Sequence, residues 1–403
     1  MDTETLLKTH SQQHLLKSYE KWNEAERENF DRQISAIDWS ILESLNAGNA
    51  EKGEIRPIDG ISLREIEANR AAYEKAGKAA VKAGKVAAVL LAGGQGTRLG
   101  TSAPKGTFNI GVTRPLYIFQ QLIENLKEVC AQCGAFVPLL IMTSEKNDEE
   151  TRAFFEQHEY FGYPKNCVRF FVQEMAPCVD LSGKLLLESK GRLASSPNGN
   201  GGWYLSLARA GLLEDELLSA VEWFNVFAVD NVLQRIADPA FVGATILSKR
   251  KSGAKVVRKA RPEEKVGVLC LEGGLPSVIE YYELSEELAN LKTDTGELAY
   301  GFGVTLNYLF HAQTLKKIAA EKIPVHVAKK KIPYMNESGE LVEPESENGY
   351  KFETLILDMI RLMGSCLPYE VEREKEFAPV KNKTGIDSVD TARVLLEKNG
   401  VKL

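Results

Sequence analysis

The sequence has few of the residues that build disulfide frameworks or metal clusters. Six cysteines and five histidines are spread over 403 residues, which excludes a small fold held together by disulfide bonds. Cys130 and Cys133 form a CxxC pair, but no second pair and no histidine cluster accompany it. We therefore interpret these two residues as plain reduced thiols on a helix, rather than as a redox or metal site. The scattered histidines do not have the spacing of a zinc site.

An excess of positive charge and long apolar runs are also lacking. The formal net charge of −6 disfavours a nucleic-acid-binding surface, because contacts along a phosphate backbone need a broad basic field. A small polyanionic ligand remains compatible with this charge, since it needs only a few local cations. No run approaches about 18 apolar residues, and the first residues lack a basic stretch followed by an apolar one. We therefore expect no membrane-spanning helix, no secretory signal and a cytoplasmic location.

The overall composition is typical of a globular protein with more than one structural unit. Hydrophobic residues make up 44% and charged residues 26% of the chain, and its length predicts about two or three domains. Residues 1–85 are polar and rich in helix formers, and Pro57 and Gly60 precede a further helical stretch at 63–82. We interpret 1–85 as a helical N-terminal unit. Its apolar residues at helical spacing include Leu15, Leu16, Tyr19, Trp22, Ile34, Ile37, Ile41 and Leu45.

From residue 86 the pattern changes to short apolar runs that alternate with helical stretches. The continuous run at 86–91 ends in glycines, as is typical of a strand buried on both faces of a parallel sheet. The alternation predicts an α/β fold over 86–325, with a Rossmann-like, mostly parallel central sheet and flanking helices. The further predicted strands are 136–142, 168–172, 223–229, 255–258, 266–271 and 303–308, and the predicted helices are 115–130, 149–157 and 203–212.

The last part of the chain, residues 326–403, is predicted to form a small α+β C-terminal unit. A basic, strand-like stretch at 325–332 is followed by a helix at 352–363, a strand at 369–373 and a last helix from Ser388. The sequence thus predicts three consecutive domains, which are 1–85, 86–325 and 326–403.

The most informative stretch is Leu90–Gly100, LLAGGQGTRLG, which is followed by Pro104-Lys105-Gly106. A strand that runs into clustered glycines leaves backbone N–H groups pointing at one spot, where a phosphate can bind. Glycines suit such a loop because the backbone can adopt positive φ and approach a ligand closely. Arg98 and Lys105 can spread over triphosphate oxygens and stabilise a leaving pyrophosphate. A glycine-rich turn with incidental cations is the alternative, which three glycines within four positions disfavour.

Two familiar phosphate-binding loops do not fit this stretch. The Walker A loop needs GxxxxGK followed by Ser or Thr, and that pattern is absent. The dinucleotide fingerprint needs GxGxxG, whereas Gly94, Gly96 and Gly100 give GxGxxxG. An acidic residue for the ribose is also missing, because Pro115 and Leu116 stand at that distance. A dehydrogenase is therefore disfavoured, and a lack of NAD binding would support this conclusion.

The loop resembles the signature of the UDP-sugar pyrophosphorylases, and it is most similar to that of the UDP-N-acetylglucosamine pyrophosphorylase type. The resemblance runs from about residue 85 to residue 395 and covers most of the chain. It implies an enzyme that converts UTP and a sugar 1-phosphate into a UDP-sugar and pyrophosphate. Seven further motifs occur in the family's order, which are FFVQ (170–173), SPNGNGG (196–202), VDN (229–231), GAKVV (253–257), IEY (279–281), KKIPY (330–334) and FAPVKN (377–382).

The resemblance implies that Leu91, Gly93, Gly94 and Gly199 lie against the nucleotide. Gln173 matches the family's glutamine that reads uracil, and a carboxamide offers both the donor and the acceptor that the O4 and N3–H edge requires. Without the resemblance, Gln173 would be interpreted as a solvated loop residue and PNGNGG as a tight turn.

Asp230 follows the predicted strand 223–229, so its carboxylate is expected where α/β sheets bind ligands. The resemblance implies that Asp230 holds Mg²⁺ between the reacting phosphates, and oxygen ligands with phosphate partners suit that ion. A helix cap is the alternative. Asn200 and Glu280 match residues that contact the sugar, and Lys381 matches a lysine that reaches the phosphates from the C-terminal unit. A tight turn, a paired surface carboxylate and a solvated lysine are the alternatives for these three.

Val304 departs from the family's pattern. The family usually has NAGN where this chain has Gly301-Phe302-Gly303-Val304, and the last asparagine of that motif contacts the sugar. A valine offers no hydrogen bond to a hydroxyl, so the sugar selectivity of the site is expected to differ. N-acetylglucosamine 1-phosphate is the leading substrate. Glucose, galactose or N-acetylgalactosamine 1-phosphate, singly or together, are the alternatives.

The predicted reaction is a single in-line displacement, in which a phosphate oxygen of the sugar 1-phosphate attacks the α-phosphorus of UTP. Both substrates are already anionic, so no base is required, and alignment and charge neutralisation suffice. We expect Arg98, Lys105 and Lys381 to supply that neutralisation together with Mg²⁺. A nucleotide-binding regulatory protein that has lost the chemistry is the non-enzyme alternative. The sequence does not fix the oligomeric state, and a monomer is one option.

Overall fold

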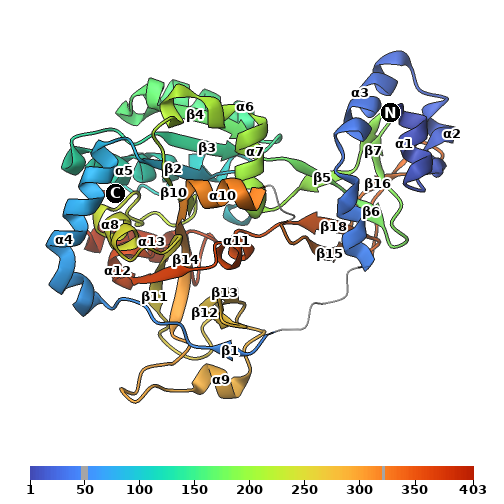
Figure 1. The fold of residues 1–403 in the computed structure, drawn as a ribbon. Helices are drawn as coiled ribbons and strands as arrows, with labels where there is room; N and C mark the ends of the chain where they lie inside the picture. The colour runs from blue at the N-terminus through green and yellow to red at the C-terminus, as the bar shows by residue number, and fades with distance from the viewer. Residues whose placement is uncertain (47–52, 320–322) are drawn as a thin grey trace. The chain divides into compact units, whose positions relative to one another are not determined.

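The computed structural model describes residues 1–46, 53–319 and 323–403 of the chain (Figure 1). The contacts between Cα atoms divide the chain into two units, and each unit combines three segments that are separated in the sequence. The larger unit comprises Lys52–Gln173, Trp203–Lys322 and Leu357–Leu403. The smaller unit comprises Met1–Glu51, Glu174–Gly202 and Ile323–Ile356.

A ten-stranded sheet forms the centre of the larger unit. Seven of its strands lie side by side in the order β1-β12-β14-β10-β2-β3-β4, while β11 pairs with β14 and β19, and β13 pairs with β12. Their bounds are β1 (Ile55–Arg56), β2 (Val86–Leu91), β3 (Leu139–Thr143), β4 (Val168–Val172), β10 (Trp223–Ala228), β11 (Ser252–Arg258), β12 (Val268–Glu272), β13 (Leu275–Ile279), β14 (Phe302–His311) and β19 (Cys366–Glu370).

Most strands of this sheet run in one direction. β4, β3, β2 and β10 are parallel neighbours in that order. β14 is antiparallel to β10, β11 and β12, so β11 and β12 share the direction of β10, as does β19, which is parallel to β11. Only β1, β13 and β14 of these ten strands run the other way. The predicted α/β fold with a mostly parallel central sheet is therefore confirmed.

Helices cover both faces of the sheet. The helices of the larger unit are α4 (Leu63–Lys82), α5 (Ile118–Cys133), α6 (Asp148–Gln157), α7 (Trp203–Arg209), α8 (Pro239–Leu247), α9 (Glu286–Asn290), α10 (Ala312–Ala319), α12 (Arg373–Glu376) and α13 (Val389–Lys398). Side chains of a strand point alternately to opposite faces. On one face, Leu90 of β2 shares an apolar core with Phe119 of α5. On the other, the ring of Trp203 of α7 lies 5.6 Å from that of Phe224 and 6.5 Å from that of Phe310.

The two units differ from the three consecutive domains expected at 1–85, 86–325 and 326–403. Helix α4, which the sequence assigns to the N-terminal unit, belongs to the larger unit because Ile66 and Val81 pack in its main core. The expected C-terminal domain is divided as well. Its strand β19 pairs with β11 of the main sheet, whereas β15 (His326–Lys330) and β18 (Gly349–Glu353) belong to the smaller unit. These pairings join segments that are remote in the sequence, so consecutive boundaries do not describe them.

The smaller unit combines the N-terminal helices with short antiparallel strands. Its core contains Leu7, Phe30 and Phe352, and β18 is the centre of a three-stranded sheet in the order β15-β18-β6. The predicted helix 352–363 is wrong at its start, because Phe352 lies in β18 and α11 begins at Ile356. The other elements are α1 (Thr3–Thr9), α2 (Leu16–Tyr19), α3 (Glu24–Ala36), β5 (Met175–Pro177), β6 (Val179–Asp180), β7 (Leu187–Ser189), β8 (Arg192–Leu193), β9 (Ser195–Pro197), β16 (Tyr334–Met335), β17 (Leu341–Val342) and α11 (Ile356–Leu362), which spans the boundary between the units.

Two properties of the helices bear on function. Cys130 and Cys133 lie on α5 with their side chains in the main core, and all six cysteines are unpaired. Burial raises the pKa of the Cys133 thiol to about 11, which suppresses the reactive thiolate. Within the ranges that the structure describes, no helix combines the length and the apolar character needed to cross a bilayer.

Candidate active site

The glycine loop leaves the sheet at the carboxyl end of β2. The side-chain amide of Asn147 donates to the carbonyl oxygen of Ala92 at 3.0 Å, and the backbone N–H of Lys105 donates to that of Gly94 at 3.1 Å. Among the described residues, the backbone N–H groups of Gly93 and Gly94 donate to no protein acceptor. Carbonyl groups of the loop are thus engaged within the protein, and the N–H groups of Gly93 and Gly94 are available to an anion, as the sequence predicts.

Gln173 lies directly beside this loop. It follows β4, its backbone N–H donates to the carbonyl oxygen of Thr143 at 2.8 Å, and its side chain is buried. A Cβ atom added to Gly93 would lie 3.0 Å from Oε1 of Gln173. A larger residue at position 93 would crowd this carboxamide, which would have to move by a few tenths of an ångström. Two residues that are predicted to bind the nucleotide are therefore brought together.

The carboxyl ends of β2 and β10 also meet. Leu91, the last residue of β2, is buried opposite Ala228 of β10, and its carbonyl oxygen accepts a hydrogen bond from Val229 at 3.3 Å. This register brings Asp230, just after β10, next to the glycine loop. The Nζ atom of Lys105 lies 3.9 Å from Oδ2 of Asp230, and the two side chains are only 11% and 24% exposed. The adjacency follows from the parallel pairing of β2 with β10.

Three cations and Asp230 form one electrostatic neighbourhood. Burial lowers the pKa of Lys105, Asp230 opposes this shift, and the positive charges of Arg98 and Lys381 add to it. Arg98 itself is exposed on a short 3₁₀ turn at Thr97–Leu99. Arg98 and Lys381 therefore lie within electrostatic reach of Lys105, which is next to Asp230, and the three predicted phosphate-binding cations can share the charge of a polyphosphate.

Lys381 belongs to the same unit as Lys105 and Asp230, which corrects the expectation that it reaches the phosphates from a separate C-terminal unit. The backbone N–H of Val380 donates to the carbonyl oxygen of Asp230 at 2.8 Å, which places Lys381 beside Asp230. Its Nζ atom donates to Oδ2 of Asp387 at 3.1 Å. No movement between units is needed to bring this lysine to the site.

Glu280 and Val304 lie together next to the cations. Burial raises the pKa of Glu280, the charge of Glu283 adds to the rise, and Lys381 opposes it. A Cβ atom added to Gly267 would lie 3.5 Å from Cγ2 of Val304 and 3.9 Å from Oε1 of Glu280. Gly267 therefore leaves room between the two predicted sugar-binding residues. The sequence reasoning missed Gly267, although a glycine inside a predicted strand often marks a close approach of another group.

The two other predicted site residues, Gly199 and Asn200, belong to the smaller unit. Gly199 has a φ of +88° and approaches the backbone of Thr354. Oδ1 of Asn200 accepts a hydrogen bond from the backbone N–H of Ile356 at 3.0 Å. Both residues line a cavity of about 330 Å³, together with Ser196, Pro197, Lys351, Glu353 and Leu355. The carbonyl end of Asn200 is thus engaged within the protein, and its NH₂ end is the part suited to a ligand.

This arrangement can be compared with known proteins. Residues 27–400 match the family described as UTP–glucose-1-phosphate uridylyltransferase. The chain belongs to this family. Human UDP-N-acetylhexosamine pyrophosphorylase-like protein 1 is 40% identical over 357 residues, which cover 85% of this chain and 70% of the human protein. The UDP-N-acetylglucosamine pyrophosphorylase of Saccharomyces cerevisiae is 36% identical, with 91% of this chain and 79% of that protein covered.

The fold agrees with that of a solved relative. The UDP-N-acetylglucosamine pyrophosphorylase of Trypanosoma brucei, solved in complex with an inhibitor, superposes with a TM-score of 0.82 at 29% identity. The match covers 97% of this chain and 83% of the other. The α/β architecture of the uridylyltransferase family is therefore present over nearly the whole chain.

The residues of this uridylyltransferase family member fit a magnesium ion that is shared with a substrate. No group of three or more His, Cys, Asp or Glu residues in the described part of the chain could hold a metal by itself. Asp230 offers one carboxylate beside Lys105, next to the glycine loop. Mg²⁺ is commonly bound by one or two carboxylates and by substrate phosphates, so the donor set suits this ion.

We expect Gly199→Ala to lower the free energy of unfolding by roughly 2 kcal/mol or more, because a non-glycine residue at positive φ is strained. The new Cβ atom would also lie 2.1 Å from the carbonyl oxygen of Thr354. Chemical denaturation measures the change. Gly94→Ala is the matched control for stability, since a Cβ atom there would meet nothing within 4 Å. Equal stability of the two variants would contradict the positive φ of Gly199 and its close approach to Thr354.

We expect the alkaline limb of kcat/KM to lie below the pH at which an ordinary lysine loses its proton. Burial lowers the pKa of Lys105 from its usual value of 10.5, so its charge is present below the shifted pKa and lost as the pH rises through it. A profile of kcat/KM between about pH 6 and pH 11 measures this limb. Lys105→Arg should remove it, because a guanidinium keeps its proton. If the alkaline limb persisted in Lys105→Arg, it could not be assigned to the loss of the proton of Lys105.

Proposed function

We propose that the chain transfers the uridylyl group of UTP to a sugar 1-phosphate, with N-acetylglucosamine 1-phosphate as the leading acceptor. The observation that carries the proposal is the convergence of three sets of groups at the carboxyl ends of adjacent parallel strands. These are the free amides of Gly93 and Gly94, the carboxamide of Gln173, and the Lys105–Asp230 pair. Membership of the uridylyltransferase family supports it, as do the names of the S. cerevisiae and T. brucei relatives.

The proposed reaction needs alignment and charge neutralisation only. A phosphate oxygen of the sugar 1-phosphate forms a bond to the α-phosphorus of UTP, and the bond to the oxygen that bridges the α- and β-phosphates breaks. The released pyrophosphate carries away the electron pair, and no proton has to be removed from the anionic nucleophile. Arg98, Lys105 and Lys381 bind the phosphates and offset the charge that develops on the leaving group. Mg²⁺ held by Asp230 would supply Lewis-acid neutralisation between the reacting phosphates.

The remaining predicted residues would bind the two ends of the product. We assign the uracil to Gln173, because its buried carboxamide lies against Gly93 in the loop that follows Leu91. We assign sugar hydroxyls to Glu280, since a carboxylate accepts hydrogen bonds. A cytoplasmic location belongs to the same proposal, and the six unpaired cysteines support a reducing compartment.

A panel of sugar 1-phosphates tests the function. The full-length protein is assayed with UTP and Mg²⁺ for pyrophosphate release, with N-acetylglucosamine, N-acetylgalactosamine, glucose and galactose 1-phosphates as acceptors. We expect the highest kcat/KM with N-acetylglucosamine 1-phosphate. A higher value with another acceptor would replace the sugar in the proposal. The absence of pyrophosphate release with every acceptor would favour a nucleotide-binding protein without this chemistry.

We expect Val304→Asn to raise kcat/KM for the preferred sugar by roughly three- to tenfold, because one added hydrogen bond contributes about 1 kcal/mol. The KM for UTP should change little, since Val304 lies beside Glu280 rather than beside Gln173. Val304→Leu is the apolar control and should give no gain. An equal change for UTP and for every sugar would show that Val304 does not face the sugar.

A further inference from the structure

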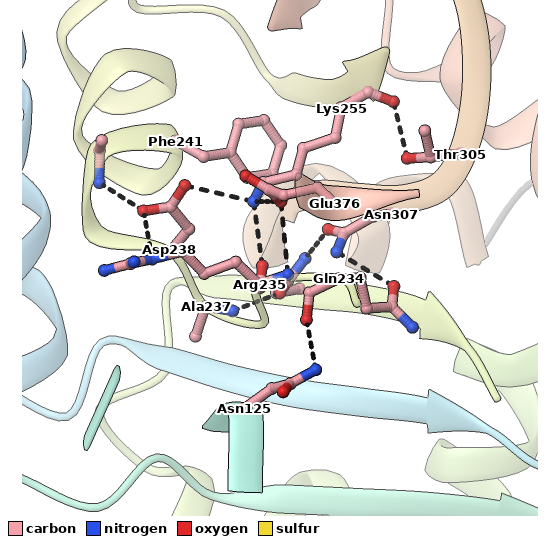
Figure 2. Close-up of polar contacts among 12 residues, drawn as sticks. Asn125, Gln234, Arg235, Ala237, Asp238, Phe241, Lys255, Thr305, Asn307 and Glu376 are labelled. Atoms are coloured by element: carbon pink, nitrogen blue, oxygen red, sulfur yellow. Dashed lines mark hydrogen bonds and ion pairs between the residues drawn. The ribbon is translucent and has the colours of Figure 1, made fainter. Parts of the chain in front are cut away.

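A buried cluster of charged and polar side chains surrounds the ammonium group of Lys255 (Figure 2). Lys255 of β11 is only 1% exposed, and its Nζ atom donates to the carbonyl oxygen of Arg235 at 3.0 Å and to Oδ2 of Asp238 at 3.2 Å. Its third partner is Oε2 of Glu376, at the end of α12. The ammonium group therefore joins β11, the loop after β10 and the segment that leads to Lys381.

The cluster pairs one buried ammonium group with two largely buried carboxylates. Burial raises the pKa of Glu376, the ammonium of Lys255 opposes this rise, and the Asp238 carboxylate adds to it. Burial by itself would also raise the pKa of Asp238, but the positive charges of Lys255 and Arg235 lower this pKa below its usual value. Buried ion pairs are often no more stabilising than apolar side chains of the same size, and a well-supported use of such groups is to fix one arrangement.

Asn231 connects this cluster to the candidate active site. It follows Asp230 and is only 2% exposed. Its side-chain NH₂ group donates to the carbonyl oxygen of Glu376 at 2.7 Å, and its Oδ1 atom accepts from the N–H of Ala378 at 2.9 Å. The N–H of Val380 donates to the carbonyl oxygen of Asp230. Together with the two bonds of Asn231, this bond forms a ladder between residues 230–231 and residues 376–380. The backbone that precedes Lys381 is thus attached to both Asp230 and Asn231.

We propose that Asn231, anchored through Glu376 to the buried Lys255, is a positioning residue that fixes Lys381 relative to Asp230. The inference rests on the proposed function, because Lys381 and Asp230 are the groups that bind the reacting phosphates in it. Asn231 touches no reacting atom in this account. Its side chain sets the backbone from which Lys381 extends, and a small misplacement of a catalytic group is costly.

The kinetic consequence follows from what Asn231 contacts. Within the described part of the chain, the side chain of Asn231 bonds residues 376 and 378 and not the glycine loop, which is assigned to the nucleotide. The affinity for UTP should therefore change little. Lys381 and Asp230 act on the charge that develops during transfer. The loss of Asn231 should therefore lower kcat and leave the KM for UTP almost unchanged.

The test compares Asn231→Ala with Asn225→Ala in the full-length protein. Asn225 is a buried asparagine on β10 whose side chain bonds Asn307, Tyr308 and Ala237, and not residues 376–380. We expect Asn231→Ala to lower kcat by roughly 10- to 100-fold, with a KM for UTP within about threefold of wild type. At temperatures below its melting temperature, we expect Asn225→Ala to have a kcat within about twofold of the wild-type value. This should hold even if Asn225→Ala loses more stability than Asn231→Ala. Equal losses of kcat in both variants, or a rise in the KM for UTP as large as the fall in kcat, would overturn the proposal.

Hydrogen exchange provides a readout that does not depend on activity. The amides of Ala378 and Val380 donate to Asn231 and Asp230, so peptides that cover 376–381 should exchange faster in Asn231→Ala and unchanged in Asn225→Ala. Glu376→Gln keeps the size of the side chain and weakens the bond to Lys255. It should also make peptides that cover 376–381 exchange faster, but by less than Asn231→Ala does. Unaltered exchange in both Asn231→Ala and Glu376→Gln would overturn the positioning role. A wild-type protein without transferase activity would instead overturn the proposed function, and the exchange data would still decide the role of Asn231.

Discussion

Asp230→Asn lowers kcat by roughly 10³-fold, equivalent to about 4 kcal/mol at the transition state. The substitution keeps the size of the side chain and removes its negative charge, and Mg²⁺ depends on that charge for tight binding. The fold should persist, because Asp230 contributes its backbone carbonyl group to the ladder with Val380, and this group is unchanged. Steady-state kinetics across a range of Mg²⁺ concentrations measure the effect, with thermal unfolding as the check on the fold.

Asp215→Asn is the matched control for this result. Asp215 is also a partly buried carboxylate paired with a cation, with its Oδ2 atom 2.6 Å from Nε of Arg169. It has no contact with the glycine loop among the described residues, so its loss should affect stability and leave kcat near the wild-type value. If Asp230→Asn retained more than about a tenth of the wild-type kcat at saturating Mg²⁺, the role of its carboxylate in the reaction would have to be abandoned.

Lys105→Ala is expected to lower kcat by roughly 10²- to 10³-fold, the range found when one group that stabilises a developing anion is removed. The effect should be large because Lys105 is mostly buried, where water screens its charge weakly. Arg98 and Lys381 act on the same region, but neither can occupy the position of the lost ammonium group. Pyrophosphate release at saturating substrates measures the change.

Two further variants separate the charge of Lys105 from its position. Lys105→Arg keeps the charge with a different shape, and should retain more activity than Lys105→Ala. Lys78→Ala removes a lysine that pairs with Glu74 on the outside of α4, and should leave kcat unchanged. Equal activity of Lys105→Ala and Lys78→Ala would show that the ammonium group near Asp230 takes no part in the reaction.

The parts of the fold that the sequence predicts well are those whose structure is indicated by residues within the element itself or next to it. Helix α4 begins and ends at the predicted residues, and its start has a capping box in which Ser62 and Glu65 bond each other's backbone. Strands β2 and β4 match their predicted ranges. β2 is a continuous apolar run that is buried along its whole length, and β4 is rich in the valine and phenylalanine residues that favour strands. Helix α8 was not predicted. It begins at Pro239, after its N-cap residue Asp238, and it is buried almost all round, so it lacks the apolar stripe that marks a surface helix.

In the candidate site too, the residues with a local sequence signal could be predicted and those positioned by remote contacts could not. The glycine loop and Asp230 could be predicted because each follows a recognisable strand, and the ends of neighbouring parallel strands meet. Gln173 could be predicted only through the resemblance to the family. The attachment of Lys381 could not be predicted in this way, since the bond between Asn231 and Glu376 joins residues 145 positions apart. The division into two units has the same cause, because the pairing of β19 with β11 is equally remote.

The most direct measurement is a structure of the protein with UTP and Mg²⁺. The account predicts that the triphosphate lies against the N–H groups of Gly93 and Gly94, that Lys105 contacts its oxygens, and that Asp230 holds Mg²⁺. The uracil should bond the carboxamide of Gln173. A nucleotide bound elsewhere in the protein, with the N–H groups of Gly93 and Gly94 bonded to the chain itself, would contradict the account.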